Sequence, residues 1–397
     1  MSFNIALTGL NAVTEQLNTV SNNIANTGTT GFKSSRTEFG SIYADTQPMG
    51  VEVLGNTQSI SLGGALMNTN RTLDLAISGG GFFVVKGTSG ETQYTRAGVF
   101  GTNSANYIVN AAGQTLQGYP TDANGNLLTG SLGDLRIKAS TLPAKQTDSL
   151  EFVANLDGNM VPPAVAPIDP ADVTSYNSTY TTKIFDSLGK EHTLTQYFAN
   201  TGANTWTVDY YVDGVAAGTQ ALTFDTDGQL TAPAGLVNVT VPPAVLPGAS
   251  AQAIDIDYTA TSQYGADFSV STNLANGYTS GQQTGVGIDS KGNVFVNYSN
   301  GERQLQGQVV LASFVNPEGL KNVSGTAWVE TIDSGAALVG TAGVAQYGKI
   351  NSGTLENSNV DLTEELVTLM QGQRNYQANT KVISTQKDLD QILFSAM

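Results

Sequence analysis

Cysteine is absent from this chain of 397 residues, and histidine occurs once, as His192. Without cysteine there is no disulfide framework, no thiolate nucleophile and no Cys-ligated metal. A zinc site around His192 would need three carboxylates, which the local spacing does not supply. No G-x-S-x-G motif occurs, and a Ser-His-Asp triad would have to use the same histidine. We therefore predict no catalytic residue, cofactor or metal, with a glycosidase-like pair of carboxylates as the open alternative.

Basic residues are scarce as well, and no long apolar run is present. The 17 Lys and Arg against 33 Asp and Glu give a formal net charge of -16. Because this charge repels phosphate backbones and anionic lipid, we expect no nucleic-acid partner. No stretch approaches the ~18 consecutive apolar residues of a membrane span, so no membrane insertion is expected. The opening MSFNIALTGLNAVTEQLNTV has no Lys or Arg and no continuous apolar core, so we predict no cleaved signal peptide.

The N-terminal segment is nearly free of charge, with Glu15 as the one charged side chain before Lys33. Its apolar residues recur at alternating intervals of three and four, which is heptad spacing. They are Phe3, Ala6, Leu10, Val13, Leu17, Val20 and Ile24. The pattern predicts a helix of about 33 Å whose narrow apolar stripe needs a partner helix. This helix should end within NNIANTG, where Asn26 and Gly28 suit a left-handed C-cap.

The C-terminal segment, residues 360–393, also has helical periodicity. Asn359 or Asp361 could cap its start, where the helix dipole favours the following acidic residues. The predicted seam is Leu362, Leu366, Leu369, Gln373, Tyr376, Thr380, Ile383, Leu389 and Leu393. Polar residues within such a seam weaken the helix pair but restrict its register. An alternative is that both terminal helices are ordinary core helices of a globular domain.

The middle of the chain has the composition of short strands and tight turns, with 44 glycines and abundant Thr, Val and Tyr. Turn signals recur as NAAG at 110, DANG at 122, DSLG at 186, DTDG at 225 and DSKG at 289. DTDG lacks the alternating ligands and the distal Glu of a calcium loop, so hairpin turns are favoured over calcium binding. The glycine run SGGGFFVV precedes a strand and not a helix, which indicates a turn and not a phosphate loop.

Proline marks a separate region, because eight of the twelve prolines lie between Pro162 and Pro247. Proline breaks central strands and stiffens loops, so this region is predicted to be a peripheral β domain. The fold class predicted is mixed and mainly β, with terminal helices forming a coiled-coil-like core region and two nested β domains. The predicted boundaries are 1–70 with 350–397 for helices and connectors, 71–141 with 276–349 for the inner β domain, and 142–275 for the inserted outer β domain.

Both ends of the chain resemble one family. NNIANTGTTGFK at 22–33, followed by Phe39, resembles the N-terminal signature of the bacterial flagellar axial proteins, the rod, hook and hook-associated group. SNVDLTEELVTLMQGQRNYQANTKVISTQ at 358–386 resembles the C-terminal signature of the same family. The N-terminal positions are Asn22, Asn23, Asn26, Thr30, Gly31, Phe32, Lys33 and Phe39. The C-terminal positions are Asn359, Asp361, Leu362, Glu365, Leu366, Gln373, Arg374, Tyr376, Gln377, Ala378, Asn379, Lys381 and Ile383.

The middle of the chain makes the resemblance to this family more specific. ISGGGFFVV, YTRAGVF, YIVNAAGQTLQGYP and GQVVLASFVNPEGL are similar to the inner β domain that hook and distal rod proteins share. KIFDSLGKEHTLTQYF and WTVDYYVDG look like the outer domain of the hook branch, which distal rod proteins lack. The ending ILFSAM departs from the family, since it lacks the basic residues common in relatives.

The resemblance implies a structural subunit of the bacterial flagellar hook, which self-assembles into a flexible curved tube. It further implies that this tube acts as a universal joint between motor and filament. The implied partners are further copies of the chain, the distal rod protein, the hook cap, the hook-filament junction protein and the flagellar type III export apparatus. Export without a cleaved signal peptide to the extracellular hook is expected. The alternatives are a distal rod protein, or a secreted β protein that binds glycan or calcium at the cell surface.

For the terminal segments, the resemblance implies that the two helices form the inner core of the tube. They would be poorly ordered in the free monomer, because each stripe lacks a partner until assembly. NNIANTGTTGFK would end the first helix and start the connector, with Phe32 and Phe39 anchored by burial. Assembly contacts are therefore expected from the N-terminal stripe and from the C-terminal helix, including Leu369 and Leu389.

Overall fold

The computed structural model describes residues 2–44, 47–122, 125–138 and 141–396. The chain divides into two compact units, one formed by residues 1–138, 285–297 and 303–397 and a second formed by residues 139–284 and 298–302. The predicted fold class, mainly β with two terminal helices, is confirmed. The three-part domain boundaries drawn from the sequence stay a prediction.

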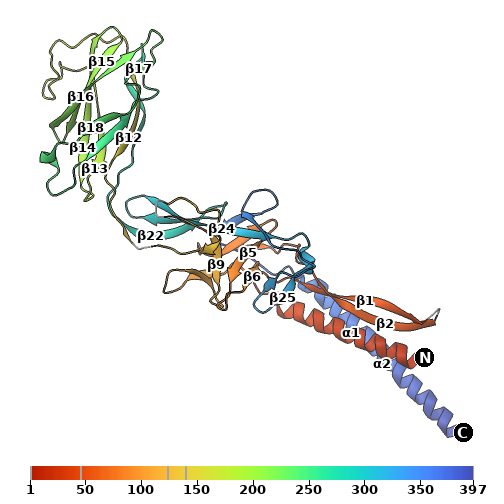
Figure 1. Cartoon of the computed structure of the whole chain (residues 1–397). Coiled ribbons are helices and arrows are strands. Elements are labelled where there is room, and N and C mark those ends of the chain that lie inside the picture. The colour runs from red at the N-terminus through yellow and green to blue at the C-terminus, as the bar shows by residue number, and fades with distance from the viewer. Residues whose placement is uncertain (1, 45–46, 123–124, 139–140, 397) are drawn as a thin grey trace. The chain divides into compact units, whose positions relative to one another are not determined.

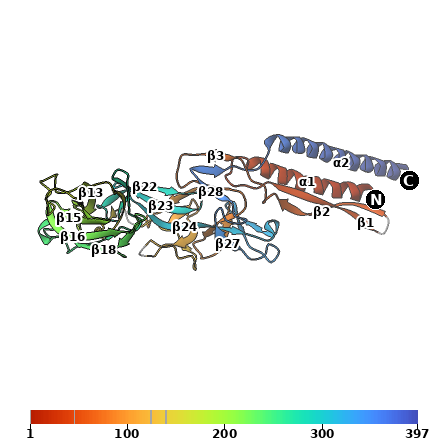
Figure 2. The same ribbon diagram turned by 90° about the horizontal axis from the view of Figure 1, so that it is seen from above.

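The first unit begins and ends with helices, as predicted. Helix α1 spans Ser2–Ala25, and helix α2 spans Leu362–Ala396. Between α1 and the sheets lies a hairpin of β1 (Ser35–Ala44) and β2 (Gln47–Gln58). We call α1, α2 and this hairpin the stem. In Figure 2, α1 lies between α2 and the hairpin. No described helix is both long enough and apolar enough to cross a membrane.

The two helices of the stem run antiparallel and approach each other closely at glycines. A Cβ atom on Gly9 would lie 3.0 Å from the side-chain nitrogen of Asn379. A Cβ atom on Gly372 would lie 2.8 Å from Leu17 Cδ2. Side chains of the partner helix therefore occupy the space beside each glycine. The helix pair depends on small residues as well as on the predicted apolar stripe.

The β1–β2 hairpin is a feature that sequence reasoning missed, since residues 1–70 were assigned only to a helix and a connector. One face of the hairpin follows α1: the hydroxyl oxygens of Thr19 and Thr37 lie 2.9 Å apart, and Val51 N donates to Thr8 Oγ1 at 3.4 Å. The strand pattern SRTEFGSIYA does not show the usual alternation in hydropathy, because the polar Thr37 is buried while Phe39 and Tyr43 are exposed.

The β part of the first unit is built around one sheet in which β23, β24, β9, β5, β6, β26 and β25 are neighbours in that order. Their bounds are β23 Asn293–Tyr298, β24 Arg303–Ser313, β9 Thr115–Pro120, β5 Phe82–Lys86, β6 Thr92–Thr95, β26 Ala327–Val329 and β25 Lys321–Val323. Joined to it are β7 Phe100–Thr102, β8 Ile108–Asn110, β10 Gly133–Asp134 and β27 Leu338–Thr341. Phe82 packs edge-on against both Phe314 and Trp328 in its core.

Two short ladders connect this sheet to the stem. They pair β3 (Leu66–Asn68) with β29 (Thr354–Glu356) and β4 (Leu75–Ser78) with β28 (Lys349–Ser352). Each ladder joins a segment that follows α1 to a segment that precedes α2. The chain therefore leaves the stem and returns to it along paired strands.

Four of the five predicted hairpin turns are confirmed at the atomic level, and the fifth, DANG at 122, includes residues 123–124, which lie outside the described residues. In DTDG, Asp225 Oδ1 accepts from the N–H groups of Asp227 at 2.9 Å and Gln229 at 2.8 Å. Gly228 adopts a φ of 78°, a conformation that glycine reaches without a steric penalty. Asn110, Asp186 and Asp289 accept in the same way from residues two and four positions later. These side-chain oxygens close turns, which is the role that the sequence pattern favoured.

The second unit is a sandwich of two sheets. One sheet has the order β13, β14, β15, β16, β17, and the other has the order β18, β19, β12, β20, with β21 also paired to β12. The bounds are β12 Ser149–Asp157, β13 Ser178–Phe185, β14 Glu191–Gly202, β15 Thr205–Val212, β16 Val215–Phe224, β17 Leu230–Ala232, β18 Val237–Thr240, β19 Ala253–Asp257, β20 Ser262–Tyr264 and β21 Ser269–Ala275. β11 (Thr141–Leu142) pairs with the start of β22 (Gly281–Ile288) where the chain enters and leaves. Prolines 162–247 all lie outside the strands, as predicted.

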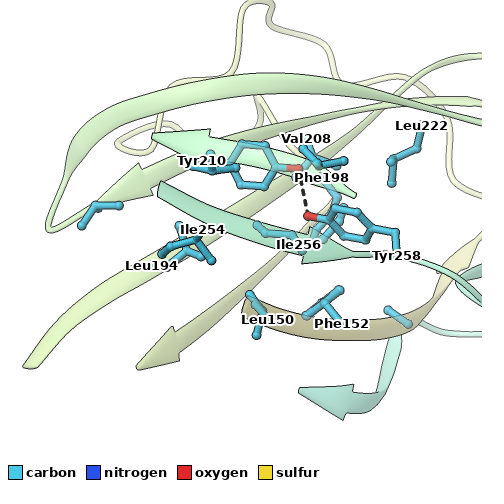
Figure 3. Close-up of a cluster of buried hydrophobic side chains, with 14 of the residues drawn as sticks. Leu150, Phe152, Leu194, Phe198, Val208, Tyr210, Leu222, Ile254, Ile256 and Tyr258 are labelled. Atoms are coloured by element: carbon cyan, nitrogen blue, oxygen red, sulfur yellow. Dashed lines mark hydrogen bonds between the residues drawn. The ribbon is translucent and has the colours of Figure 1, made fainter. Parts of the chain in front are cut away.

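The core of the second unit is apolar and contains one buried polar chain. Phe152 and Phe198 stack with their ring centroids 5.8 Å apart. Above them the hydroxyl oxygens of Tyr210 and Tyr258 lie 2.9 Å apart, and Tyr258 also donates to Gln196 Oε1 (Figure 3). Burial raises the pKa of both phenols above the ordinary value of 10.0. These hydroxyls stay protonated and link the two sheets through the core.

Candidate assembly interface

The apolar stripe of α1 is covered within its own chain. Ala6, Val13 and Val20 are buried, Leu10, Leu17 and Ile24 are half-buried, and Phe3 is 45% exposed at the helix start. The cover comes from α2 on one side and from the hairpin on the other. The reason predicted for disorder of the free helices, a stripe without a partner, is therefore wrong for α1. The order of the helices in the free monomer stays a prediction.

The seam of α2 differs from the one predicted. The residues that approach α1 include Gly372 and Asn379, with Leu369 and Ile383 half-buried. Leu362, Leu366, Gln373, Arg374, Tyr376, Gln377 and Leu389 are exposed. The seam was predicted from the spacing of apolar residues. The close approach of the two helices instead depends on Gly372, which has no side chain and so does not appear in an apolar pattern. Leu393 lies on α2, and its side chain lies outside the described residues. As predicted for one of two candidates, Asp361 caps α2 by accepting from Thr363 N at 2.8 Å.

A buried charge cluster joins the stem to the sheets, and we call Lys33, Arg96 and Glu356 the junction. Lys33 Nζ donates to Glu356 Oε1 at 2.6 Å and to the carbonyl oxygen of Leu62 at 2.6 Å. Arg96 donates to Glu356 Oε2 at 3.2 Å, and the N–H of Gly64 donates to Oε1 at 2.9 Å. The carboxylate of Glu356 therefore binds two cations, Lys33 and Arg96, and the backbone of the loop at Gly64.

The junction is shielded from solvent, since the side chains of Lys33, Arg96 and Glu356 are at most 5% exposed. Burial lowers the pKa of Lys33, and the hydrogen bond and charge of Glu356 oppose that shift. Burial likewise lowers the pKa of Arg96 against the same carboxylate. Removing the carboxylate would leave two buried cations facing each other, which is strongly destabilising in a protein interior.

Two asparagines of the terminal motifs meet at the start of β1. Asn23 exchanges two hydrogen bonds with the backbone of Ser35, at 2.8 and 2.9 Å, and donates to Glu365 Oε1 at 2.7 Å. Asn359 accepts from Ser34 N at 2.7 Å and donates to the carbonyl oxygens of Ser59 and Leu62. The end of α1, the connector and the start of α2 are thus fastened together. The long sequence separation of these partners hid this role from sequence reasoning.

Two expectations for the segment from Asn22 to Phe39 are corrected. Asn26 and Gly28 are not left-handed; the left-handed residue is Gly31, with a φ of 69°. A Cβ atom there would lie 2.5 Å from Ala97 N, so any side chain at this position would collide with the backbone at Arg96 and Ala97. Phe39 is 40% exposed and does not anchor the connector by burial. Phe32 and Thr30 are half-buried, while Asn22 is exposed on the last turn of α1.

The stem carries many large apolar side chains that its own chain leaves exposed. They are Phe3, Ile5, Leu7, Phe39, Tyr43, Met49, Val53, Leu54, Leu362, Leu366, Val367, Met370, Tyr376, Val382, Leu389 and Ile392. They belong to three elements, α1, α2 and the hairpin, whose course Figure 1 shows. An apolar surface of this extent marks a site of protein–protein contact. We call it the apolar surface of the stem.

Four segments of the chain match family models, and all four models describe flagellar proteins. Residues 3–33 match the "Flagella basal body rod protein" model, and residues 351–396 match the "Flagellar basal body rod FlgEFG protein C-terminal" model. Residues 76–161 match the "Flagellar hook protein FlgE/F/G D1 domain", and residues 155–278 match the "Flagellar basal body protein FlaE D2 domain".

Relatives that match over nearly their full length distinguish the hook proteins from the rod proteins named by these models. The flagellar hook protein FlgE of Salmonella typhimurium is 38% identical over 99% of this chain and 98% of its own. FlgE of Rhizobium meliloti is 36% identical over 98% of this chain and 96% of its own, and FlgE of Borreliella burgdorferi is 31% identical over 98% and 97%. The chain belongs to the flagellar hook protein family. This family is a structural one, and membership assigns the chain to the flagellar hook.

The fold of the hook family agrees with the strands described above. The crystal structure of the Helicobacter pylori flagellar hook protein FlgE2 matches 72% of this chain and 99% of that chain, with a TM-score of 0.56 at 13% identity. Three residues of the terminal motifs hold the connector after α1 in place. Lys33 binds Glu356, Asn359 binds Ser34, and Gly31 packs against Ala97.

The one histidine of this hook-family chain has a structural environment. His192 Nδ1 lies 2.7 Å from Asp213 Oδ2, and its Nε2 lies 3.5 Å from Asp186 Oδ2. Burial raises the pKa of Asp213, but hydrogen bonds from Thr193 and His192 outweigh it and lower the pKa overall. The group fastens two turns of the β13–β14–β15 sheet. Among the described residues, no three His, Asp or Glu side chains are placed to hold a metal ion.

Proposed function

We propose that this hook-family chain polymerises into a curved, flexible tube that acts as a universal joint between the motor and the filament. The observation that supports this most is the apolar surface of the stem, which the chain itself does not cover. Burying such side chains between copies would stabilise a polymer by about 25 cal/mol for each Å² of apolar area. Because the relatives are hook proteins, we expect the partner to be further copies of this chain.

The stem and the second unit would divide the work of such a tube. The stem has large exposed apolar residues on three elements, which suits contacts that hold. The second unit keeps its largest side chains, such as Trp206 and Phe152, fully buried in a core of its own. Because the fold of this unit depends on its own core, its contacts with other copies can change as a tube bends without unfolding it. We therefore assign polymer integrity to the stem and curvature to the second unit.

Deletion of the second unit tests this division. Lys145 and Tyr278 exchange two backbone hydrogen bonds, at 3.0 and 2.9 Å, so residues 146–277 can be replaced by a short Gly-Ser linker. We expect the shortened chain to form tubes that are straight in negative-stain electron microscopy, beside curved tubes from the full chain. If the shortened chain keeps the fold of the stem by circular dichroism and forms no tube, the assignment is wrong.

Export and the further partners are part of the same proposal. A chain of this family would reach the extracellular hook through the flagellar type III export apparatus and would contact the distal rod protein, the hook cap and the hook-filament junction protein. We expect the mature chain to keep its N-terminal segment, because α1 is needed to complete the stem. Mass spectrometry of isolated hooks checks this, since a mature chain that starts well after Met1 contradicts it.

A further inference from the structure

The stem contains a groove whose floor is α1. It is lined by Gly9, Ala12, Val13 and Gln16 of α1, by Phe39 and Val51 of the hairpin, and by Asn375, Ala378 and Asn379 of α2, and has a volume of about 400 Å³. Every residue in this lining is uncharged, and the two walls come from elements on opposite sides of α1. The groove therefore suits a narrow, uncharged and partly apolar segment such as one face of a helix.

The end of α2 extends beyond the helix pair. Gly9 lies opposite Asn379, and because the helices run antiparallel, Ser2 lies opposite Gln386, seven residues further along each helix. The last turns of α2, residues 387–396, therefore continue past the first described residue of α1, as Figure 1 shows. Leu389 on this extension is 54% exposed.

One face of α2 leads from the groove to the extension. Asn375 and Val382 are seven residues apart, as are Val382 and Leu389, so all three lie on the same side of the helix. Val382 is 45% exposed. The end of α2 from Val382 onward thus presents two exposed apolar residues at heptad spacing, Val382 and Leu389, which is a form that a helical groove accepts.

The extension cannot enter the groove of its own chain. Leu389 lies ten residues beyond Asn379, which borders the groove, and this distance is about 15 Å along a straight helix at 1.5 Å per residue. The helix also runs away from the groove. A groove and a ridge on one chain that cannot meet within that chain are suited to meet between two copies.

We propose that the end of α2 from one copy docks into the groove between α2 and the hairpin of a second copy. The proposal rests on the proposed function, since it names the surfaces that a polymer would use. Groove and extension are different surfaces, so each copy offers one of each, and the contact is head-to-tail. Such a contact leaves a free groove and a free extension at the two ends, and growth continues without closure.

Cysteine cross-linking in the full-length chain tests the pairing directly, because the natural sequence has no cysteine background. Phe39 is 40% exposed and Leu389 is 54% exposed, so Phe39→Cys and Leu389→Cys leave the folded core untouched. The two single variants are mixed, polymerised by salting out, imaged by electron microscopy and oxidised. The matched control replaces Leu389→Cys with Leu188→Cys, which is 67% exposed in a turn of the second unit.

We expect covalent dimers from the mixture of Phe39→Cys and Leu389→Cys, at least about tenfold more than from either variant alone or from the control mixture. The double variant should give a ladder of covalent multimers, because each copy links to the next. Tubes that form without these cross-links would overturn the docking proposal and leave the proposed function in place. An unmodified chain that forms no tube under any salt condition would contradict the proposed function itself.

A peptide competition covers the case in which a cysteine variant does not polymerise. A synthetic peptide of residues 380–396 is added in excess to the unmodified chain before salting out. We expect it to reduce tube formation severalfold, while the same peptide with Leu389→Asp does not. Equal effects of the two peptides, or no effect of either, would overturn the proposal.

Discussion

The second unit and the stem use apolar residues for different ends. In the second unit Trp206, Phe152 and Tyr258 are at most 1% exposed, and their partners all belong to the same sandwich. In the stem Leu54, Leu389 and Phe3 are 66%, 54% and 45% exposed. The second unit also exposes Leu188, Leu236 and Leu274, at 67%, 61% and 64%, but it has a large aromatic core of its own. The buried apolar side chains described in the stem are only Ala6, Ala12, Val13 and Val20, so its larger apolar residues are left for contacts with other copies. Folding and assembly are thus carried by separate parts of one chain.

The largest expected effect is on the stability of the second unit. Trp206→Ala should lower the free energy of unfolding of the second unit by about 3–5 kcal/mol, because a fully buried aromatic side chain leaves a cavity. Differential scanning calorimetry should show one transition at lower temperature and the transition of the stem unchanged. The exposed Leu236→Ala serves as the control. A shift of both transitions together would show that the units do not fold independently.

The next effect falls on the attachment of the stem. Glu356→Gln should destabilise the first unit by about 3 kcal/mol, because Lys33 and Arg96 lose their buried counter-charge. The comparison variant is Glu38→Gln, whose ion pair with Arg36 is exposed, and there we expect a change within about 0.5 kcal/mol. Urea denaturation followed by circular dichroism measures both. Similar losses in the two variants would contradict the role given to the junction.

A smaller loss of stability with a large loss of assembly is expected from the helix pair. Leu17→Asp places a carboxylate against Gly372, where no cation is within reach among the contacts described, at a cost of about 2 kcal/mol. We expect folded monomers that no longer sediment as polymer after salting out. Asn18→Asp, on the exposed side of α1, is the control. Normal tubes from Leu17→Asp would disprove the role of the helix pair.

The smallest effect is the pH dependence of the second unit. The pKa of Asp213 is lowered in the folded state from its ordinary value of 3.8, so its ionised form stabilises the fold above that pH. This contribution is lost as the pH falls below 3.8 through the lowered pKa. Asp213→Asn should therefore flatten the loss of thermal stability between about pH 4 and pH 2. An unchanged slope in the variant would assign the acid sensitivity to other carboxylates.

Local patterns in the sequence predicted much of the fold. The stripe of α1 was readable because its intervals of three and four are a property of neighbouring residues, and the Asx turns were readable because Asp225 and Gly228 lie within one turn. The junction was not readable, since Lys33 and Glu356 are 323 positions apart and each looks like an ordinary surface charge. The seam of α2 was misplaced because Gly372 contributes by being small.

The pairing of α1 with α2 means that the stem can form only from a nearly full-length chain. Its two helices come from opposite ends of the sequence, Ser2–Ala25 and Leu362–Ala396, so they can pair only after nearly the whole chain has been made. A chain cut short before Leu362 has no α2, and the stripe of α1 then lacks its cover on that side. If the stem carries the contacts between copies, as proposed, such truncated copies lack a complete surface for joining the polymer.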